Sequence, residues 1–158
     1  MPIHDKKTRS VQKTIFKQSQ ATLTIGSVCS GLCTDALVGK NVATVLSKEL
    51  VVSFCCDNDK SVKAYAEQNA EALRHQRWYD DVLSKDFQST AGYVDVFSAG
   101  FPCQPWSTEG KMLGQNDDRS APMSAITKYI RSKQPSVFIL ENVSGILHQK
   151  HAKARVVT

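Results

Sequence analysis

The chain has 158 residues, of which 41% are apolar and 22% are charged, so one domain with a sizeable core is expected. It holds no run of about 18 apolar residues and no apolar segment near its start, so we expect neither a membrane-spanning helix nor a secretory signal. The formal net charge of +5 and the pI of about 9.0 suit a polyanionic partner but do not require one.

The N-terminal half is predicted to start with an arm and then to alternate strands with helices. Residues 1–21 carry five Lys and Arg side chains against one Asp, and we expect a disordered basic arm there. The apolar and β-branched runs Thr22–Val28 and Val51–Cys56 predict two buried strands. A weaker helix fits Thr34–Leu46, which Gly39 interrupts. A second helix is predicted from the apolar spacing of Val62, Tyr65, Ala66, Ala70 and Leu73.

The C-terminal half continues the alternation. A short strand is predicted near Tyr79–Leu83, and longer strands at Tyr93–Ser98 and Ser136–Leu140. The helix between the last two is predicted from the spacing of Met123, Ile126 and Ile130. Residues 148–158 are basic and are interpreted as a tail or as the point where a longer chain was truncated. This pattern predicts an α/β fold with a mainly parallel sheet and helices on both faces.

The five cysteines follow no spacing that is typical of zinc ligands, and we expect no metal site. Cys29, Cys33, Cys55 and Cys56 lie among apolar or small residues, where a free thiol acts as a small apolar group. Because no secretory signal is visible, we expect reduced thiols in an intracellular protein. Its compartment would be the nucleus in a eukaryote, or the cytoplasm or nucleoid for a bacterial or viral protein.

Residues with useful chemistry follow the predicted strands at the point where each strand ends. Ser30-Gly31, Asp57, Asp81, Pro102-Cys103 and Glu141-Asn142 each come after a different strand. In a parallel sheet, ligands bind beyond the carboxyl ends of the strands. The sequence therefore predicts one ligand site along this edge.

Three of these positions also have ordinary structural explanations. Gly31 would let a backbone approach a ligand, although a plain turn accounts for it equally well. Asp57 stands where doubly wound folds place an acid against a ribose, or it caps the helix that begins near residue 60. Asp81 is either an exposed loop acid or a partner for an adenine amino group.

The segment Phe101–Ser107 (Phe-Pro-Cys-Gln-Pro-Trp-Ser) carries the strongest signal. Prolines on both sides stiffen the backbone around Cys103, and Gly100 lets the strand turn sharply before it. A cysteine held in this way at a ligand-binding edge favours a nucleophile, the alternative being a buried thiol in a proline-bracketed turn. Glu141 adds an acid at the neighbouring strand end, or is a helix cap or surface carboxylate. Together they indicate covalent catalysis with proton donation.

The segment Val94–Val143 closely resembles the cytosine-5 DNA methyltransferases. The family's Pro-Cys-Gln and Glu-Asn-Val motifs appear as Pro102–Gln104 and Glu141–Val143. Asp57-Asn58-Asp59 stands in the place of the acidic ribose-binding motif, and Asp81-Val82 in that of the adenine contact. The resemblance covers about residues 22–147. It implies the cofactor-binding and catalytic part of a Rossmann-like, S-adenosylmethionine-dependent methyltransferase fold, truncated at its C-terminus.

The resemblance also implies a role for each site residue. Cys103 would add to carbon 6 of a cytosine flipped out of double-stranded DNA, and Glu141 would donate a proton or hydrogen bond to ring nitrogen 3. Carbon 5 would then take the methyl group of S-adenosylmethionine. Cofactor contacts are implied for Ser30, Gly31, Leu32, Asp57, Asn58, Asp81, Val82 and Pro102. Substrate contacts are implied for Ser107, Arg119 and Asn142.

The sequence departs from the family in several places. Cys29 and Cys33 stand where the family has an aromatic residue and a second glycine, Asn58 replaces a bulky residue, and residues 119–122 read Arg-Ser-Ala-Pro instead of Arg-Gly-Thr-Leu. Family members continue with an arginine motif and a target-recognition domain, so we expect a fragment that is inactive alone. Two alternatives stay open: a cofactor- or DNA-binding remnant without turnover, and a tRNA cytosine-5 methyltransferase.

Overall fold

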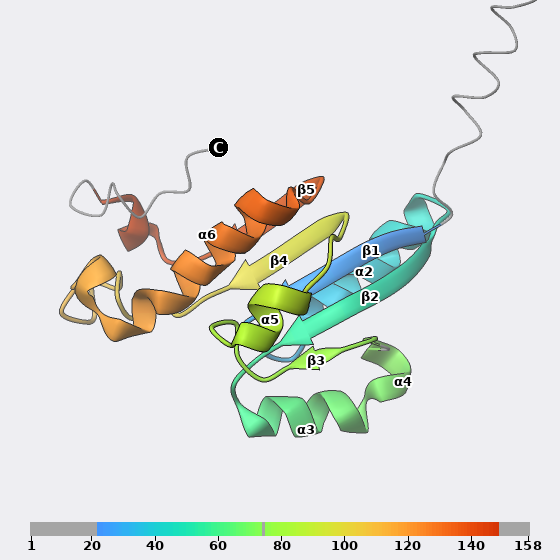
Figure 1. The fold of residues 1–158 in the computed structure, drawn as a ribbon, viewed down its shortest axis with the longest axis horizontal. Helices are drawn as coiled ribbons and strands as arrows, with labels where there is room; N and C mark the ends of the chain where they lie inside the picture. The colour runs from blue at the N-terminus through green and yellow to red at the C-terminus, as the bar shows by residue number, and fades with distance from the viewer. Residues whose placement is uncertain (1–21, 74, 149–158) are drawn as a thin grey trace, which may run out of the picture.

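A computed structural model describes residues 22–73 and 75–148, and the predicted basic arm and most of the predicted tail lie outside these ranges. Its centre is one sheet whose strands all run parallel, in the order β3-β2-β1-β4-β5 (Figure 1). This is the order of the first five strands in the doubly wound dinucleotide-binding fold, whose full order is 3-2-1-4-5-6. The strands are β1 Thr22–Val28, β2 Glu49–Cys56, β3 Trp78–Tyr79, β4 Val96–Gly100 and β5 Val137–Glu141.

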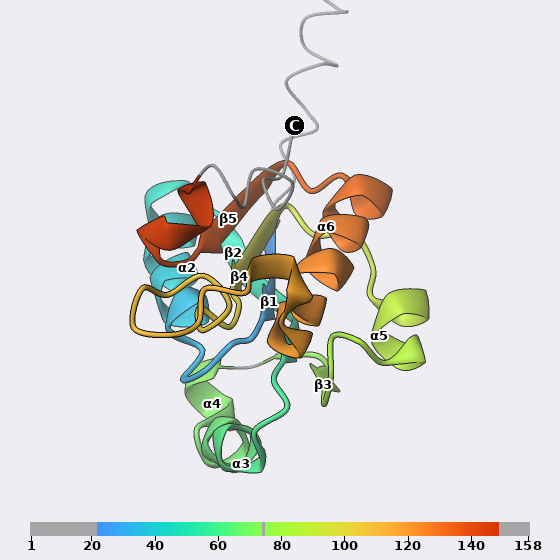
Figure 2. The same ribbon diagram turned by 90° about the vertical axis from the view of Figure 1, so that its left-hand side faces the viewer.

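Helices cover both faces of the sheet (Figure 2). Helices α5 (Lys85–Thr90) and α6 (Ala121–Lys133) pack on one face, whereas α2 (Thr34–Val45), α3 (Lys60–Gln68) and α4 (Ala70–Leu73) supply side chains to the core of the other. Three short 3₁₀ turns follow β4 and β5: η1 Gly114–Asn116, η2 Asp118–Ser120 and η3 Ser144–Leu147. The predicted Rossmann-like α/β fold is confirmed. Within the described ranges, no helix combines the length and apolar character that crossing a membrane requires.

One predicted helix differs from the structure in its bounds, and one helix was not predicted. The helix expected to run through Leu73 is divided at Asn69 into α3, which ends at Gln68, and α4, which contains Ala70 and Leu73; the side-chain amide of Asn69 donates to the carbonyl of Tyr65 at 2.8 Å. An Asn that bonds a helix carbonyl in this way competes with the helical backbone ladder. Helix α5 was not predicted. Its N-cap is Ser84, whose hydroxyl accepts from the Phe87 amide. The helix is only six residues long, so no apolar spacing along it predicted a helix.

Two strands are displaced from their predicted positions. Strand β4 begins at Val96 rather than at Tyr93, because the side chains of Tyr93 and Asp95 bond to neighbouring strands in place of a regular ladder. The short third strand is Trp78–Tyr79, so Asp81 and Val82 lie in the loop that follows it. Both shifts leave the predicted site residues beyond strand ends.

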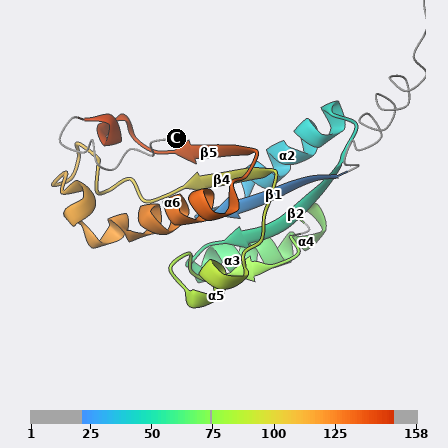
Figure 3. The same ribbon diagram turned by 45° about the horizontal axis from the view of Figure 1, so that its top comes forward.

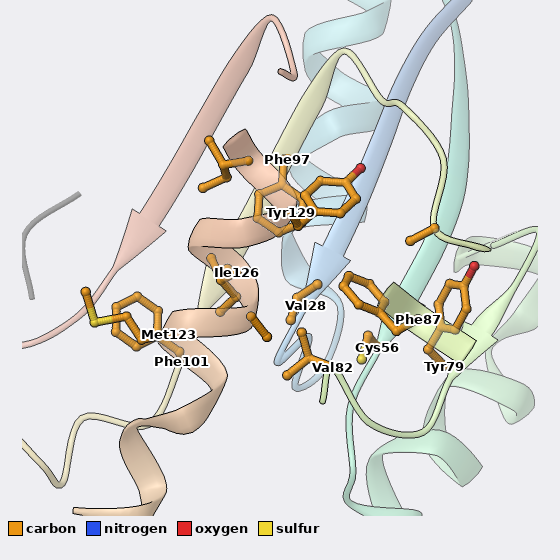
Figure 4. Packing of buried hydrophobic residues seen from close by; sticks show 14 of the residues in the cluster. Val28, Cys56, Tyr79, Val82, Phe87, Phe97, Phe101, Met123, Ile126 and Tyr129 are labelled. Carbon is orange, nitrogen blue, oxygen red and sulfur yellow. The ribbon is translucent and has the colours of Figure 1, made fainter. Parts of the chain in front are cut away.

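The larger core cluster is aromatic and lies under α5 and α6 (Figure 4). Phe97 stacks on Tyr129 with ring centroids 4.5 Å apart, and Phe87 meets Tyr79 edge-on at 5.2 Å. Such pairs add about 0.5–1.5 kcal/mol each beyond the area that they bury. Towards the carboxyl ends of the strands the same cluster continues through Val28, Cys56, Val82 and Phe101. It therefore forms the floor beneath the candidate site.

Candidate active site

A cavity of about 270 Å³ lies at the carboxyl edge of the sheet. The arrowheads of β1, β2, β4 and β5 point the same way in Figure 3, so the loops that follow them meet at one end. Six of the predicted cofactor residues line the cavity: Gly31, Asp57, Asn58, Asp81, Val82 and Pro102. Ser30 and Leu32 are not among its lining residues. The predicted convergence on one edge is therefore what the fold produces.

The loop after β1 is shaped by left-handed backbone. Cys29, Gly31 and Cys33 have φ angles of 52°, 48° and 54°. A Cβ added at Gly31 would meet no atom within 4 Å, so the backbone there faces open space beside the cavity. Ser30 fastens this loop to β2, since its hydroxyl accepts from the Cys56 amide at 3.1 Å and donates to the Cys56 carbonyl at 3.2 Å. Leu32 is 56% exposed.

Asp57 joins two loops of the site. Its Oδ2 accepts from the Gly31 amide and its Oδ1 from the Asp59 amide, both at 3.0 Å. The residue that caps α3 is instead Asp59, whose carboxylate accepts from the Ser61 amide at 2.7 Å. The alternative that Asp57 caps this helix is therefore wrong. A carboxylate has about four acceptor positions, so Asp57 retains capacity for a ligand hydroxyl.

The loop after β3 supplies an acid and an apolar wall. Asp81 closes a tight turn, because its Oδ1 accepts from the Leu83 amide at 2.8 Å. Val82 is buried against the aromatic core and still lines the cavity. This pairing places an apolar side chain next to a carboxylate, a combination that suits a ligand with both apolar and polar groups.

Cys29 and Cys56 also line the cavity, and both thiols are held in the neutral form. Burial, followed by the carboxylates of Asp57 and Asp81, raises the pKa of Cys29 to about 12. Burial and the neighbouring Cys29 raise the pKa of Cys56 well above its ordinary value, with the same acids contributing. Among the described residues that line the cavity, none is cationic, so two carboxylates make its potential negative.

Cys103 lies in a turn that begins three residues after β4. The Trp106 and Ser107 amides both donate to the Cys103 carbonyl, at 2.9 and 3.0 Å, and Trp106 is fully buried behind the turn. Cys103 itself is half-buried, in contrast to the buried thiols of Cys33, Cys55 and Cys56, and all five cysteines are free. The turn therefore anchors the backbone of Cys103 and leaves part of the residue open to solvent.

Glu141 stands next to the strand from which this turn extends. It is the register partner of Gly100 across β4 and β5, and a Cβ at Gly100 would lie 3.4 Å from its Oε2. The absence of a side chain at residue 100 thus leaves room for the Glu141 carboxylate, which is exposed. Neither Cys103 nor Glu141 is among the residues that line the cavity, but their neighbours Pro102 and Gly100 are.

The side chains of the three predicted substrate residues all form hydrogen bonds within the protein. Asn142 donates from Nδ2 to the Phe101 carbonyl at 2.9 Å, and the Ser107 hydroxyl accepts from the Glu109 amide at 3.2 Å. Arg119 donates from Nε and Nη2 to Asp117 at 2.9 and 2.7 Å. Those charged hydrogen bonds lower the pKa of Asp117 to about 2. Contact of these residues with a substrate stays a prediction.

Five lining residues were absent from the predicted contacts: Cys29, Cys56, Gly100, Gln104 and Pro122. The sequence did contain a signal for Cys56. It is the last residue of a predicted strand, and in the sheet it lies beside Val28, the last residue of β1. Gln104 lies within the Pro-Cys-Gln motif, in which Pro102 was assigned a cofactor contact and Cys103 a catalytic role, but Gln104 was given neither. Pro122 is the second residue of α6, and it was named above only within the stretch 119–122 that departs from the family.

Known proteins resemble this chain in sequence and in fold. The family model described as C-5 cytosine-specific DNA methylase matches residues 40–157. The type II methyltransferase M.PspPI of Psychrobacter sp. (strain TA137) is 37% identical over 89 residues, which cover 56% of this chain and 21% of that protein. The type II methyltransferase M.NgoBI of Neisseria gonorrhoeae is 36% identical over 94 residues, covering 59% and 29%. The chain thus spans less than a third of the length of either relative.

Among solved structures, TrmN from Thermus thermophilus resembles the fold with a TM-score of 0.50 and 15% identity. That likeness covers 88% of this chain and 39% of the other, and it concerns the fold alone. The family match extends over most of the sequence and includes β2 to β5, the Pro-Cys-Gln turn and the Glu-Asn-Val segment. The chain therefore belongs to the family of C-5 cytosine-specific DNA methylases.

Proposed function

We propose that these residues form the cofactor-binding and catalytic part of an enzyme that transfers a methyl group from S-adenosylmethionine to carbon 5 of cytosine in DNA. One observation carries the proposal. The acidic cavity is bordered by Gly100 and Pro102, which are the neighbours of Glu141 and of Cys103 respectively. A ligand in the cavity would thus lie beside a thiol and a carboxyl group on adjacent strand ends.

The cavity residues fit the proposed cofactor. Asp57 retains acceptor capacity for ribose hydroxyls, and the open backbone at Gly31 leaves space beside it. Val82 and Pro102 offer apolar surface for an adenine ring next to the Asp81 carboxylate. The negative lining favours a sulfonium over a neutral thioether by simple Coulomb attraction. The cofactor would supply the electrophilic methyl group.

The chain's own residues would carry the remaining steps. The Cys103 thiolate forms a bond to carbon 6 of a cytosine that has left the base stack, while Glu141 donates a proton or hydrogen bond to ring nitrogen 3. Carbon 5 would then take the methyl group, which leaves neutral S-adenosylhomocysteine. Water would accept the proton from carbon 5, the bond between carbon 6 and sulfur would break with its electron pair on Cys103, and a proton held on nitrogen 3 would return to Glu141, which restores the ring.

Covalent trapping tests this chemistry in the full-length protein. DNA that contains 5-fluorocytosine should form an adduct with Cys103, because fluorine at carbon 5 cannot leave as a proton does. Cys103→Ser should form no adduct, since a hydroxyl is far less ionised than a thiol. Cys55→Ser is the matched control, and we expect it to keep the adduct because Cys55 is buried and does not line the cavity.

The trapping assay also separates the alternatives. A protein that binds DNA and S-adenosylmethionine but never forms the adduct would contradict the proposal and support a binding remnant. An adduct with fluorinated tRNA but not with fluorinated DNA would support the tRNA alternative.

Cofactor binding can be tested on the 158-residue chain alone. Calorimetry should show that Asp57→Ala weakens S-adenosylmethionine binding by roughly tenfold or more, the range for hydrogen bonds to a charged group. Asp80→Ala is the matched control, because Asp80 is an exposed acid that pairs with Lys63 and does not line the cavity. Equal affinities of Asp57→Ala and the unsubstituted chain would rule out the proposed role.

A further inference from the structure

The side-chain amide of Asn142 is bonded at both of its ends. Its Nδ2 donates to the carbonyl oxygen of Phe101 at 2.9 Å, and its Oδ1 accepts from the Val143 amide at 2.9 Å. The partners fix the orientation of the amide, because a carbonyl needs a donor and an N–H needs an acceptor. Asn142 thus links the end of β5 to the turn after β4, two residues before Cys103.

A second contact joins the same two segments on the other side of Cys103. A Cβ added at Gly145 would overlap the carbonyl oxygen of Trp106. The backbone of η3 therefore lies directly against the Cys103 turn, and only glycine permits this approach. Trp106 is fully buried, and the Pro105 carbonyl accepts from the Gly114 amide at 2.8 Å, so the rear of the turn is held as well.

The two contacts are placed on both sides of the candidate nucleophile. Phe101 precedes Cys103 by two residues and Trp106 follows it by three. On the other segment, Asn142 is the residue after Glu141, and Gly145 comes three residues later. Any movement of the Cys103 turn relative to Glu141 must therefore break the Asn142 bond or separate η3 from Trp106.

We infer that Asn142 and Gly145 are positioning residues, which hold Cys103 at a fixed place relative to Glu141, and that the Asn142 amide serves this contact instead of gripping DNA. This inference rests on the proposed function for its catalytic meaning. Reactions that need a nucleophile and an acid together gain from such preorganisation, since small displacements cost large rate factors. The interpretation replaces the substrate contact that the family resemblance implied for Asn142.

Site-resolved alkylation of the 158-residue chain tests the contact without requiring catalysis. The chain is labelled with iodoacetamide at several pH values, and mass spectrometry of its peptides gives the labelling rate of Cys103 at each. The rate at high pH, where it no longer rises, is the limiting rate. Asn142→Ala should raise this rate roughly fivefold, a factor that one hydrogen bond of ordinary strength supports. Asn41→Ala, on the exposed side of α2, is the matched control and should leave the rate unchanged.

Cys29 provides an internal reference in the same experiment. It is half-buried at the other side of the site, and its raised pKa of about 12 keeps its labelling slow. A general loss of structure would accelerate Cys29 together with Cys103, whereas loss of the positioning contact accelerates Cys103 alone. An unchanged Cys103 rate, or equal acceleration of both thiols, would overturn the inference.

Two further variants cover a failure of Asn142→Ala to fold. Asn142→Ser keeps a polar group but is too short to bridge to Phe101, and it should raise the Cys103 rate in the same way. Gly145→Ala should also raise it, because the added methyl group must displace η3 from Trp106. If both of these fold and leave Cys103 labelling unchanged, the inference is wrong.

The catalytic meaning is tested in the full-length protein with the fluorinated DNA. Asn142→Ala should slow adduct formation roughly fivefold, by the same hydrogen-bond energy, and should leave DNA affinity unchanged. Weaker DNA binding with an unchanged rate of adduct formation would instead restore the substrate-contact role. If the unsubstituted protein forms no adduct, the proposed function fails, while the alkylation result still decides whether Asn142 positions Cys103.

Discussion

Cys33 occupies a backbone conformation that usually belongs to glycine. Its φ of 54° at the start of α2 is left-handed, and its thiol is fully buried. The hydrogen bond with Cys33, together with burial, raises the pKa of Cys55 well above its ordinary value. The side chain is therefore accommodated by packing on β2, although the backbone conformation costs about 1–2 kcal/mol for a residue with a Cβ.

A pair of substitutions separates these two effects. Cys33→Gly and Cys33→Ala both remove the thiol, but only glycine relieves the left-handed backbone. We expect Cys33→Gly to be more stable than Cys33→Ala by about 1 kcal/mol in urea unfolding. The same two substitutions at Thr44, an exposed position inside α2, should show the opposite order because a helical backbone favours alanine. If Cys33→Gly were less stable than Cys33→Ala, backbone strain would not be the main effect on stability at residue 33.

Residue 57 illustrates what sequence alone could resolve about a side chain. Its place after a strand predicted an acid at the ligand edge, and it does line the cavity there. The sequence did not decide between a ligand contact and a helix cap, because Asp57 and Asp59 both precede α3 at plausible capping distances. Asp59 is the cap because its own backbone is extended, with φ of −83° and ψ of 118°. The amino-acid composition around it does not specify these angles.

At the scale of elements, a polar network ties together the amino ends of three strands. Asp95 Oδ2 accepts from the Thr24 amide and hydroxyl, both at 2.8 Å, and its Oδ1 accepts from the Tyr93 hydroxyl at 3.2 Å. The Tyr93 hydroxyl also lies 2.8 Å from the Ser136 hydroxyl, just before β5. Burial raises the pKa of Asp95, but these hydrogen bonds outweigh it and hold the pKa below its ordinary value.

This network should make stability depend on acid pH. A carboxylate with a lowered folded pKa stabilises the fold above its unfolded pKa of about 3.9, and the contribution is lost as the pH falls through the folded value. Asp95→Asn should cost about 1–2 kcal/mol at pH 7, because its amide cannot accept all the same bonds. Urea unfolding at pH 7 and at pH 3 should show this difference shrinking at the lower pH. Exposed Asp118→Asn is the control, and a pH-independent difference at Asp95 would contradict the assignment.

The elements show why the fold was more predictable than its details. Strand β1 has its predicted bounds because its seven residues alternate between partly buried and buried side chains at the start and are all buried from Ile25 to Val28. Strand β4 and helix α5 were shifted or missed because side-chain bonds from Asp95 and Ser84 set their starts. The Asp95 bond joins residues 71 apart, which a local pattern cannot reveal, whereas the Ser84 cap joins residues three apart and was a local signal that the apolar spacing alone did not use.

For the molecule as a whole, the two edges of the sheet differ. Strand β3, at one edge, has two residues, whereas β5 at the other has five and contains no proline or lysine. On the face away from α6, Val137 and Ile139 of β5 are 52% and 55% exposed. Short strands, lysine and proline are the usual protections of a sheet edge, and β5 has none of them.

We expect the 158-residue chain to self-associate through this edge. Light scattering or sedimentation at increasing concentration should show particles larger than a monomer, and Ile139→Lys should reduce them, because a charge at an edge strand opposes pairing. Val45→Lys is a matched control, since Val45 is an equally apolar and more exposed residue on α2, away from the edge. Equal reduction by both variants would point to general solubility instead of edge pairing.

The buried indole beside the candidate nucleophile has an optical consequence. The chain has two tryptophans: Trp106 packs edge-on against Phe101 with centroids 5.5 Å apart, while Trp78 lies in β3 against His75. Indole emission shifts to longer wavelength as its surroundings become wetter. In a Trp78→Phe background, the fluorescence of Trp106 would therefore report, without any added label, each occasion on which the turn of Cys103 opens to water.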